Sequence, residues 1–154
     1  MSNRRAAREA ILKAIYAEEL GKNSVQDINK QLLKIETGDN TDDHKFAERS
    51  FYLTVENKTE YDELISKHIN NWEVDRLAVI DKLILRMAVN ELLNFEDIPV
   101  KVTINEAIEL AKNYSTRKSG NFVNGILDAI TTDLKKNDKI NKTGRGLLQA
   151  SDKE

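Results

Sequence analysis

The segment from about Asp75 to Phe95 constrains the fold of this chain more than any other. Its apolar residues do not keep to one stripe but cover most of a helical cylinder: Leu77, Val79, Ile80, Leu83, Ile84, Leu85, Met87, Ala88, Val89, Leu92 and Leu93. A helix that is apolar nearly all round is packed on several sides by other elements. Charged residues interrupt the segment, and its apolar part is too short to cross a bilayer of about 30 Å. We therefore expect a protein folded around a central buried helix.

The other apolar residues follow the three- and four-residue spacing of amphipathic helices. Residues 3–20 and 121–134 are two such helices. A third, closed by Gly38, carries an expected buried stripe of Ile28, Leu32 and Ile35.

Four helix starts are indicated by side chains that cap free backbone amides, the first being that of the helix closed by Gly38: Ser24, Thr41, Thr59 and Thr103. The clearest is Thr103 followed by Glu106, because in a capping box each of these side chains satisfies an amide of the first turn. We expect a helix to open at Thr103.

Composition favours an all-α protein. A chain of 154 residues fits one domain, and six glycines with a single proline argue against a turn-rich β protein and against disorder. We predict an all-α compact bundle of about seven helices over residues 1–136. Residues 137–154, rich in Lys, Asn, Asp and Gly, are expected to form a flexible tail.

No enzymatic constellation is present in the sequence. The chain has no cysteine and two histidines, so neither a thiolate site nor a metal-ligand cluster is expected. The acid pairs Asp42–Asp43 and Asp62–Glu63 are adjacent, and adjacent side chains on a helix point about 100° apart. Glycine-rich phosphate loops are missing as well. We predict no catalysis, cofactor or metal.

Charge is segregated along the chain although the net charge is only −2. Residues 1–15 carry four bases and one acid, residues 112–145 carry eight bases and three acids, and residues 36–81 carry five bases and twelve acids. Two positive ends thus flank an acidic middle. If the ends pack side by side they form one basic patch, which would bind phosphates by releasing counterions.

Four stretches together resemble the NusB family of bacterial transcription antitermination factors. They are RRAAREA at Arg4–Ala10 with Ala14–Tyr16, DKLILRMA at Asp81–Ala88 with Glu91–Leu92, PVKVTINEAIELAK at Pro99–Lys112, and FVNGILD at Phe122–Asp128. The resemblance covers about residues 4–134 and is densest from 81 to 130. The loop of residues 115–121 is more basic than in the better-known members, and the tail is an extension.

The resemblance implies an all-helical bundle of two packed subdomains and a non-enzymatic RNA-binding factor. Together with NusE, a ribosomal small-subunit protein, such a factor recognises the single-stranded boxA element of nascent ribosomal RNA leaders. The complex helps RNA polymerase to resist termination. Because no signal-peptide pattern follows the first arginines, we expect a cytoplasmic protein, either a monomer or a homodimer.

Arginines in the first helix are the first candidate RNA contacts. Arg4 and Arg8 share a helix face and, with Arg5, could grip phosphate or stack on a base. Their alternative is a solvated helix start. Tyr16 joins this set, with the core or its rim as the alternative. Arg86 either opens onto RNA or pairs with an acid, since an unpaired buried charge is unfavourable.

The last helix supplies the second set of candidate contacts. Phe122 is a candidate stacking platform for an unpaired base, with core packing as the alternative. Lys118 could meet phosphate, while Asn121 and Asn124 could read a base edge; a solvated lysine, a helix cap and a structural amide are the alternatives.

The resemblance also suggests where NusE binds. Because NusE is a basic ribosomal protein, Asp81 and Glu91 could form an acidic surface that faces it. Acids on a solvated helix face are the alternative.

Two other functions stay open. The fold also resembles the leading domain of ribosomal-RNA cytosine methyltransferases, but that activity needs a further cofactor domain and a catalytic cysteine. A helical oligomerisation module with merely solvated basic ends is the other alternative.

Overall fold

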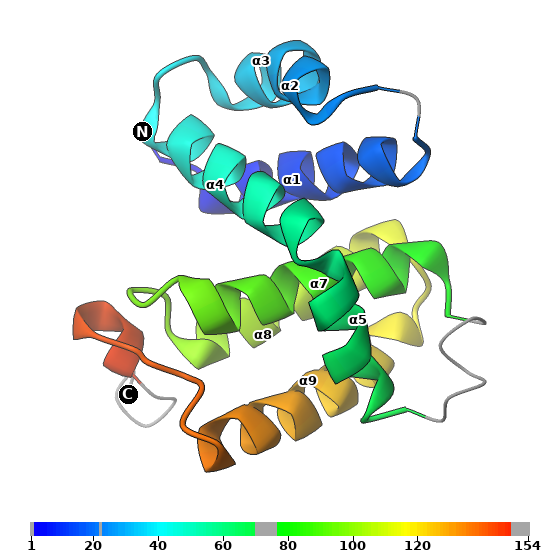
Figure 1. Cartoon of the computed structure of the whole chain (residues 1–154), viewed down its shortest axis with the longest axis vertical. Coiled ribbons are helices and arrows are strands. Elements are labelled where there is room, and N and C mark those ends of the chain that lie inside the picture. The colour runs from blue at the N-terminus through cyan, green and yellow to red at the C-terminus, as the bar shows by residue number, and fades with distance from the viewer. Residues whose placement is uncertain (1, 22, 70–76, 149–154) are drawn as a thin grey trace. The chain divides into compact units, whose positions relative to one another are not determined.

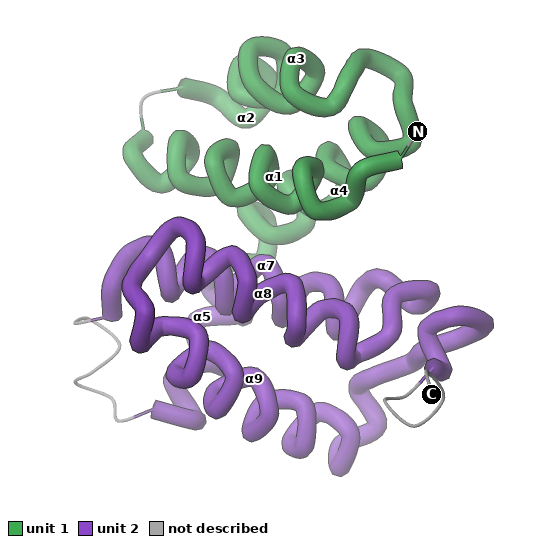
Figure 2. The backbone as a smooth tube through the Cα atoms, turned by 180° about the vertical axis from the view of Figure 1, so that it is seen from behind, with its two compact units in different colours: residues 1–58 green, residues 59–154 purple. Residues whose placement is uncertain are grey.

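The computed structural model describes residues 2–21, 23–69 and 77–148, and every regular element in these ranges is helical (Figure 1). The chain forms two compact units, residues 1–58 and residues 59–154 (Figure 2). The all-α fold and its division into two helical units are therefore confirmed. None of the described helices is both long and apolar enough to cross a membrane.

Unit 1 is built from α1 (Arg4–Glu19), α2 (Val25–Ile28), η1 (Asn29–Leu33), α3 (Lys34–Thr37) and α4 (Asp42–Glu56). α1 packs against α4, and its buried Ala7, Ala10 and Ala14 let another helix approach closely. Thr41 caps α4 as predicted, because its Oγ1 accepts a hydrogen bond from the backbone N of His44 at 2.9 Å.

The segment from Val25 to Thr37 is one continuous helical run that contains a π-turn, η1. The predicted buried stripe is wrong in part: Ile28 is buried, but Leu33 follows it inward in place of Leu32, and Ile35 is 74% exposed. In a π-turn the backbone hydrogen bonds span five residues instead of four. The next inward position after Ile28 therefore moves by one residue.

A buried amide holds this π-turn to α4. The side chain of Asn29 donates from Nδ2 to Oε2 of Glu48 at 2.6 Å and to the hydroxyl of Tyr52 at 3.1 Å. Its Oδ1 lies 3.0 Å from Nε2 of His44. All three partners belong to α4, so one side chain fastens the irregular turn to the neighbouring helix.

Unit 2 is built from α5 (Lys58–Ser66), α7 (Val79–Asn94), α8 (Val100–Tyr114), α9 (Ser119–Lys136) and the short 3-10 turn η2 (Gly144–Leu147). α7 packs against both α8 and α9, and its side chains Leu83, Ile84, Leu85 and Val89 are fully buried. The predicted central helix is confirmed. The helix begins at Val79, later than the sequence predicts, and Leu77 and Ala78 before it are not helical. Residues 70–76 lie outside the described residues.

Two polar contacts join α7 to α5. Arg86 donates from Nε and Nη2 to the two carboxylate oxygens of Asp62, both at 2.7 Å. Further along α7, Oδ1 of the fully buried Asn90 accepts a hydrogen bond from the hydroxyl of Tyr61 at 2.8 Å.

The predicted capping box at Thr103 is wrong. α8 begins three residues earlier, with Pro99 at its N-cap, and proline suits a helix start because its fixed φ matches and it has no N–H to satisfy. Thr103 lies within the first turns of α8, where its hydroxyl donates to Oε1 of Glu91 at 2.9 Å. Thr103 therefore serves as a buried hydrogen-bond partner of Glu91 on α7 and does not cap the start of α8.

Residues 137–148, which we name the strap, are not the flexible tail that the sequence predicts. The strap folds back to the end of α7: the backbone N of Thr143 donates to the carbonyl of Glu96 at 3.0 Å. Lys142 donates from Nζ to the carbonyls of Glu91 at 3.1 Å and Phe95 at 2.7 Å. These bonds fasten the strap to carbonyls at and just after the end of α7, of which those of Glu91 and Phe95 also accept a backbone hydrogen bond from Phe95 and Ile98. Residues 149–154 lie outside the described residues.

Burial of the Lys142 ammonium lowers its pKa, against the opposing effect of the negative charges of Glu91, Asp97 and Glu96. The strap also passes so close to the turn after α7 that a Cβ on Gly146 would collide with the carbonyl oxygen of Glu96.

We predict that Gly146→Ala lowers the free energy of unfolding by about 1–3 kcal/mol, the usual effect of overpacking. The control is Gly125→Ala in α9, where a Cβ meets no atom within 4 Å and alanine favours the helix by about 0.5–1 kcal/mol. Urea unfolding followed by circular dichroism measures both. Equal stability of the two variants would contradict the close contact of the strap.

We also predict that Asp62→Ala destabilises the protein more than Arg86→Met. The first change strips the carboxylate from a guanidinium whose side chain is 5% exposed, for an expected loss of about 1–3 kcal/mol. The second places an apolar chain in the buried position and leaves Asp62, which is 31% exposed, in contact with water. Urea unfolding of the two variants under one condition tests the order, and the reverse order would contradict it.

Candidate RNA-binding surfaces

The arginines at the start of α1, Arg4, Arg5 and Arg8, are named here the α1 surface. The guanidinium carbon of Arg4 lies 4.3 Å from the ring centroid of Phe46, and that of Arg8 lies 5.3 Å from it. The predicted shared face of Arg4 and Arg8 is thus observed, with both cations over one aromatic ring. The two differ in exposure, because Arg8 is only 5% exposed whereas the side chain of Arg4 is 43% exposed.

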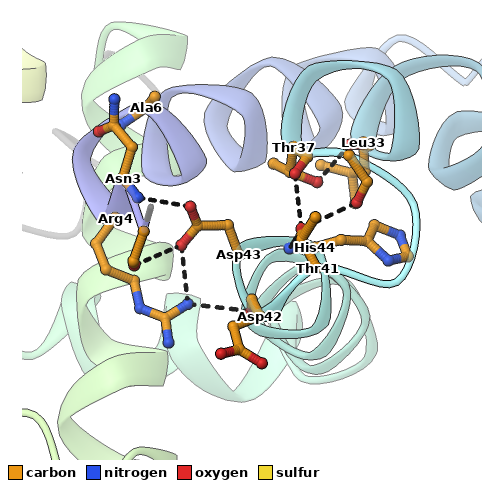
Figure 3. Close-up of polar contacts among 11 residues, drawn as sticks. Asn3, Arg4, Ala6, Leu33, Thr37, Thr41, Asp42, Asp43 and His44 are labelled. Carbon is orange, nitrogen blue, oxygen red and sulfur yellow. Dashed lines mark hydrogen bonds and ion pairs between the residues drawn. The ribbon is translucent and has the colours of Figure 1, made fainter.

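Arg4 also contacts the start of α4. Its Nη1 contacts Oδ1 of Asp43 at 3.4 Å and the carbonyl of Asp42 at 3.3 Å, as Figure 3 shows. The same Asp43 carboxylate accepts hydrogen bonds from the backbone N of Asn3 and the hydroxyl of Ser2. Asp43 therefore ties the start of α1 to the start of α4. Within the described residues the Nε and Nη2 groups of Arg4 have no hydrogen-bond partner, so they remain donors for a ligand.

Arg5 and Tyr16 form a different part of α1. Both are exposed, Tyr16 by 41%. Eleven residues make about three helical turns, so the two side chains share a face and stand about 16 Å apart along the axis. An extended ligand could contact both, whereas a single group could not.

The start of α9 presents the second set of candidates, Lys118, Asn121, Phe122 and Asn124, which we name the α9 surface. The three polar residues are exposed and Phe122 is half-buried. Lys118 occupies the N-cap position and Phe122 follows it by one turn. A lysine at the positive end of a helix dipole strengthens a field that attracts phosphate. The half-buried ring of Phe122 lies one turn further along the helix.

The loop before α9 is fixed by Ser119, which is 4% exposed. Its hydroxyl donates to Oδ2 of Asp81 at 2.9 Å and lies 3.0 Å from the hydroxyls of Ser115 and Thr116. This network also explains why α9 begins at Ser119, two residues before the predicted start. The lysine and the phenylalanine that flank Ser119 are therefore presented by an ordered turn.

The two acids expected to face NusE are buried instead. Asp81 is 7% exposed and bound to Ser119, while Glu91 is 2% exposed and bound to Thr103. Carboxylates in these positions join helices of unit 2 and do not form an acidic surface. The expectation is corrected on this point, and the reason is that both acids lie on a helix surrounded by others.

Arg86 is likewise removed from the candidate RNA contacts. It is 4% exposed and paired with Asp62 through two hydrogen bonds, which is the alternative that the sequence left open. A buried guanidinium needs such a partner, since an unpaired buried charge is strongly destabilising.

Sequence reasoning missed Phe46 and Asp43, which position the α1 surface. Asp43 entered the prediction only as part of an acid pair, and Phe46 was not among the candidate site residues. Nothing in the spacing of either residue indicates an arginine about forty positions away. Only the packing of α4 against α1 brings them together.

Comparisons with known proteins agree with this architecture. The model of the NusB family matches residues 5–132 of the chain. The transcription antitermination protein NusB of Salinibacter ruber is 47% identical over 148 residues, which are 96% of this chain and 92% of that protein. The protein of the same name from Chloroherpeton thalassium is 40% identical over 95% of this chain and 69% of its own length.

Solved structures give the same result. T. maritima NusB superposes with a TM-score of 0.78 at 39% identity, over 86% of this chain and 92% of that one. A chain from a structure of the antitermination factors NusB and NusE in complex with dsRNA superposes with a TM-score of 0.75 at 27% identity, over 84% of this chain and 96% of that one. On the family match, the relatives and the fold together, this chain belongs to the NusB family.

Proposed function

We propose that this chain is a non-enzymatic transcription antitermination factor that binds the boxA element of nascent ribosomal RNA leaders together with NusE. The observation that carries the proposal is the α9 surface, where an exposed lysine, two exposed amides and a half-buried aromatic ring follow an ordered turn. The names of its relatives support antitermination, and one structural neighbour was solved with NusE and RNA.

Each surface has a distinct task in this proposal. Arg4 and Arg5 of the α1 surface hold phosphates, and Arg8 packs against the same Phe46 ring as Arg4. Phe122 stacks on an unpaired base, a contact worth about 1–3 kcal/mol. Asn121 and Asn124 read base edges, which a single strand exposes and an A-form duplex does not.

The partners follow from the same family membership. NusE joins the complex through residues other than Asp81 and Glu91, which are buried. RNA polymerase in its antitermination form is the larger assembly, and we infer a cytoplasmic location because bacterial transcription takes place there. The chain acts as a monomer or a homodimer, and sedimentation with and without RNA separates these states from a simple oligomerisation module.

We predict that Phe122→Leu weakens boxA binding by roughly 5- to 150-fold, because leucine fills the space but has no aromatic face. Phe122→Tyr, which keeps the ring, should bind like the parent chain. Fluorescence anisotropy with a labelled single-stranded boxA RNA, in the presence and absence of NusE, measures the affinity. Unchanged affinity of Phe122→Leu, with its helical circular dichroism intact, would remove stacking from the mechanism.

Arg5→Gln should make RNA binding less dependent on salt. Each phosphate contact on a single strand contributes about 0.7 to the slope of log K against log salt concentration, so the slope should fall by about that amount. Lys13→Gln is the matched control, because Lys13 is an exposed cation of α1 that pairs with Glu36 at 3.0 Å. Equal changes of slope in both variants would show that the α1 surface acts only through overall charge.

A further inference from the structure

Unit 2 contains a groove between α8, α9 and the strap, with a volume of about 770 Å³. This is within the range of about 300–1,000 Å³ that is usual for ligand sites. Its roof comes from the strap, which lies beyond the residues 5–132 that the family model matches. The strap side of the groove is therefore outside the segment that defines the family, whereas the α8 side lies within it.

The groove is continuous with the α9 surface. Asn124 belongs to both, and Asp128, Thr131 and Lys135 continue from it along the same side of α9 at steps of three and four residues. From Asn121 to Lys135 this polar stripe extends about 21 Å along the helix. An extended chain that passes Phe122 therefore has a path into the groove.

The charge of the groove suits a polyanion. Lys101, Lys135 and Lys142 line it, against the single acid Asp128. Lys142 is engaged by the carbonyls of α7. Within the described part of the chain, Lys101 and Lys135 have no ion-pair partner, so both are available to phosphates.

The remaining lining indicates what else the ligand carries. Amides of Asn105 and Asn141 face the groove besides Asn124, and an amide offers the paired donor and acceptor that match a base edge. The groove is also lined by Ile104 and Ile140, which provide apolar surface for the face of a base. Thr131 adds a buried hydroxyl that has no hydrogen-bond partner among the described residues. An acidic peptide would use the lysines and could pair with the amides, but its carboxylate side chains would leave the apolar surface of the two isoleucines uncovered.

We propose that this groove binds single-stranded RNA that flanks the boxA element, an inference that rests on the RNA-binding function proposed above. Phosphates of the flank contact Lys101 and Lys135, and its bases contact the amides and the two isoleucines. The strap forms the roof of the groove, held there by Lys142 and by the close approach of Gly146 to Glu96.

The test compares two labelled RNAs, one with the boxA element alone and one with flanking nucleotides added at each end in turn. We expect tighter binding of an extended RNA, with a salt slope steeper by about 1.4 for two additional phosphate contacts. The double variant Lys101→Gln/Lys135→Gln should lose both gains and bind the boxA-only RNA as before. Lys136→Gln/Lys139→Gln, which changes two exposed lysines outside the groove lining, should keep both gains.

The outcomes separate this inference from the proposed function. Normal binding of boxA RNA without any gain from the flanks would overturn the groove alone, whereas failure of both RNAs to bind would overturn both proposals. Equal losses in the two double variants would reduce the effect to overall charge. Binding of a glutamate-rich peptide that depends on Lys101 and Lys135, without a gain from RNA flanks, would assign the groove to an acidic protein partner and overturn the inference.

A second readout does not depend on affinity. Side-chain amide signals of Asn105 and Asn141 in NMR spectra should shift on addition of the extended RNA and not on addition of the boxA-only RNA. The reverse pattern would contradict the proposal.

Discussion

The need to satisfy polar groups on a buried helix determines how unit 2 is assembled. α7 carries four such groups, and each finds its partner on a neighbouring helix: Asp81 with Ser119 of α9, Arg86 with Asp62 and Asn90 with Tyr61 of α5, and Glu91 with Thr103 of α8. Apolar packing alone would tolerate a helix that slides or rotates against its neighbour. A buried donor or acceptor left without a partner would be unfavourable, so these pairs select one register for each contact.

Helix periodicity accounts for most of what could be predicted from the sequence. The central helix and the caps at Ser24 and Thr41 follow from local patterns, because periodicity and capping depend on neighbours within a few residues. The failures have one physical origin. A π-turn held by Asn29, a threonine bound to Glu91 and a strap held by Lys142 all depend on partners distant in sequence, which spacing does not reveal.

The candidate site residues show the same difference between what neighbours in sequence determine and what distant partners determine. Lys118 and Asn121 lie on the surface, so their exposure was foreseen from local pattern and resemblance. Asp81, Glu91 and Arg86 are charged residues that were also expected to contact a partner, but they lie inside unit 2, where their charges join helices. Residue type alone therefore did not separate a ligand contact from an internal link. Whether such a residue is exposed or internal depends on how many other helices pack against the helix that carries it.

The π-turn η1 also bears on how this fold tolerates change over evolution. A π-turn accommodates one residue more than an α-helix does between the same two inward-facing side chains. A chain one residue shorter between Ile28 and Leu33 could close the same contacts with an ordinary α-helix. Deletion of a single residue from this π-turn is thus compatible with an unchanged core, although elsewhere in a helix it would rotate every following side chain by about 100°.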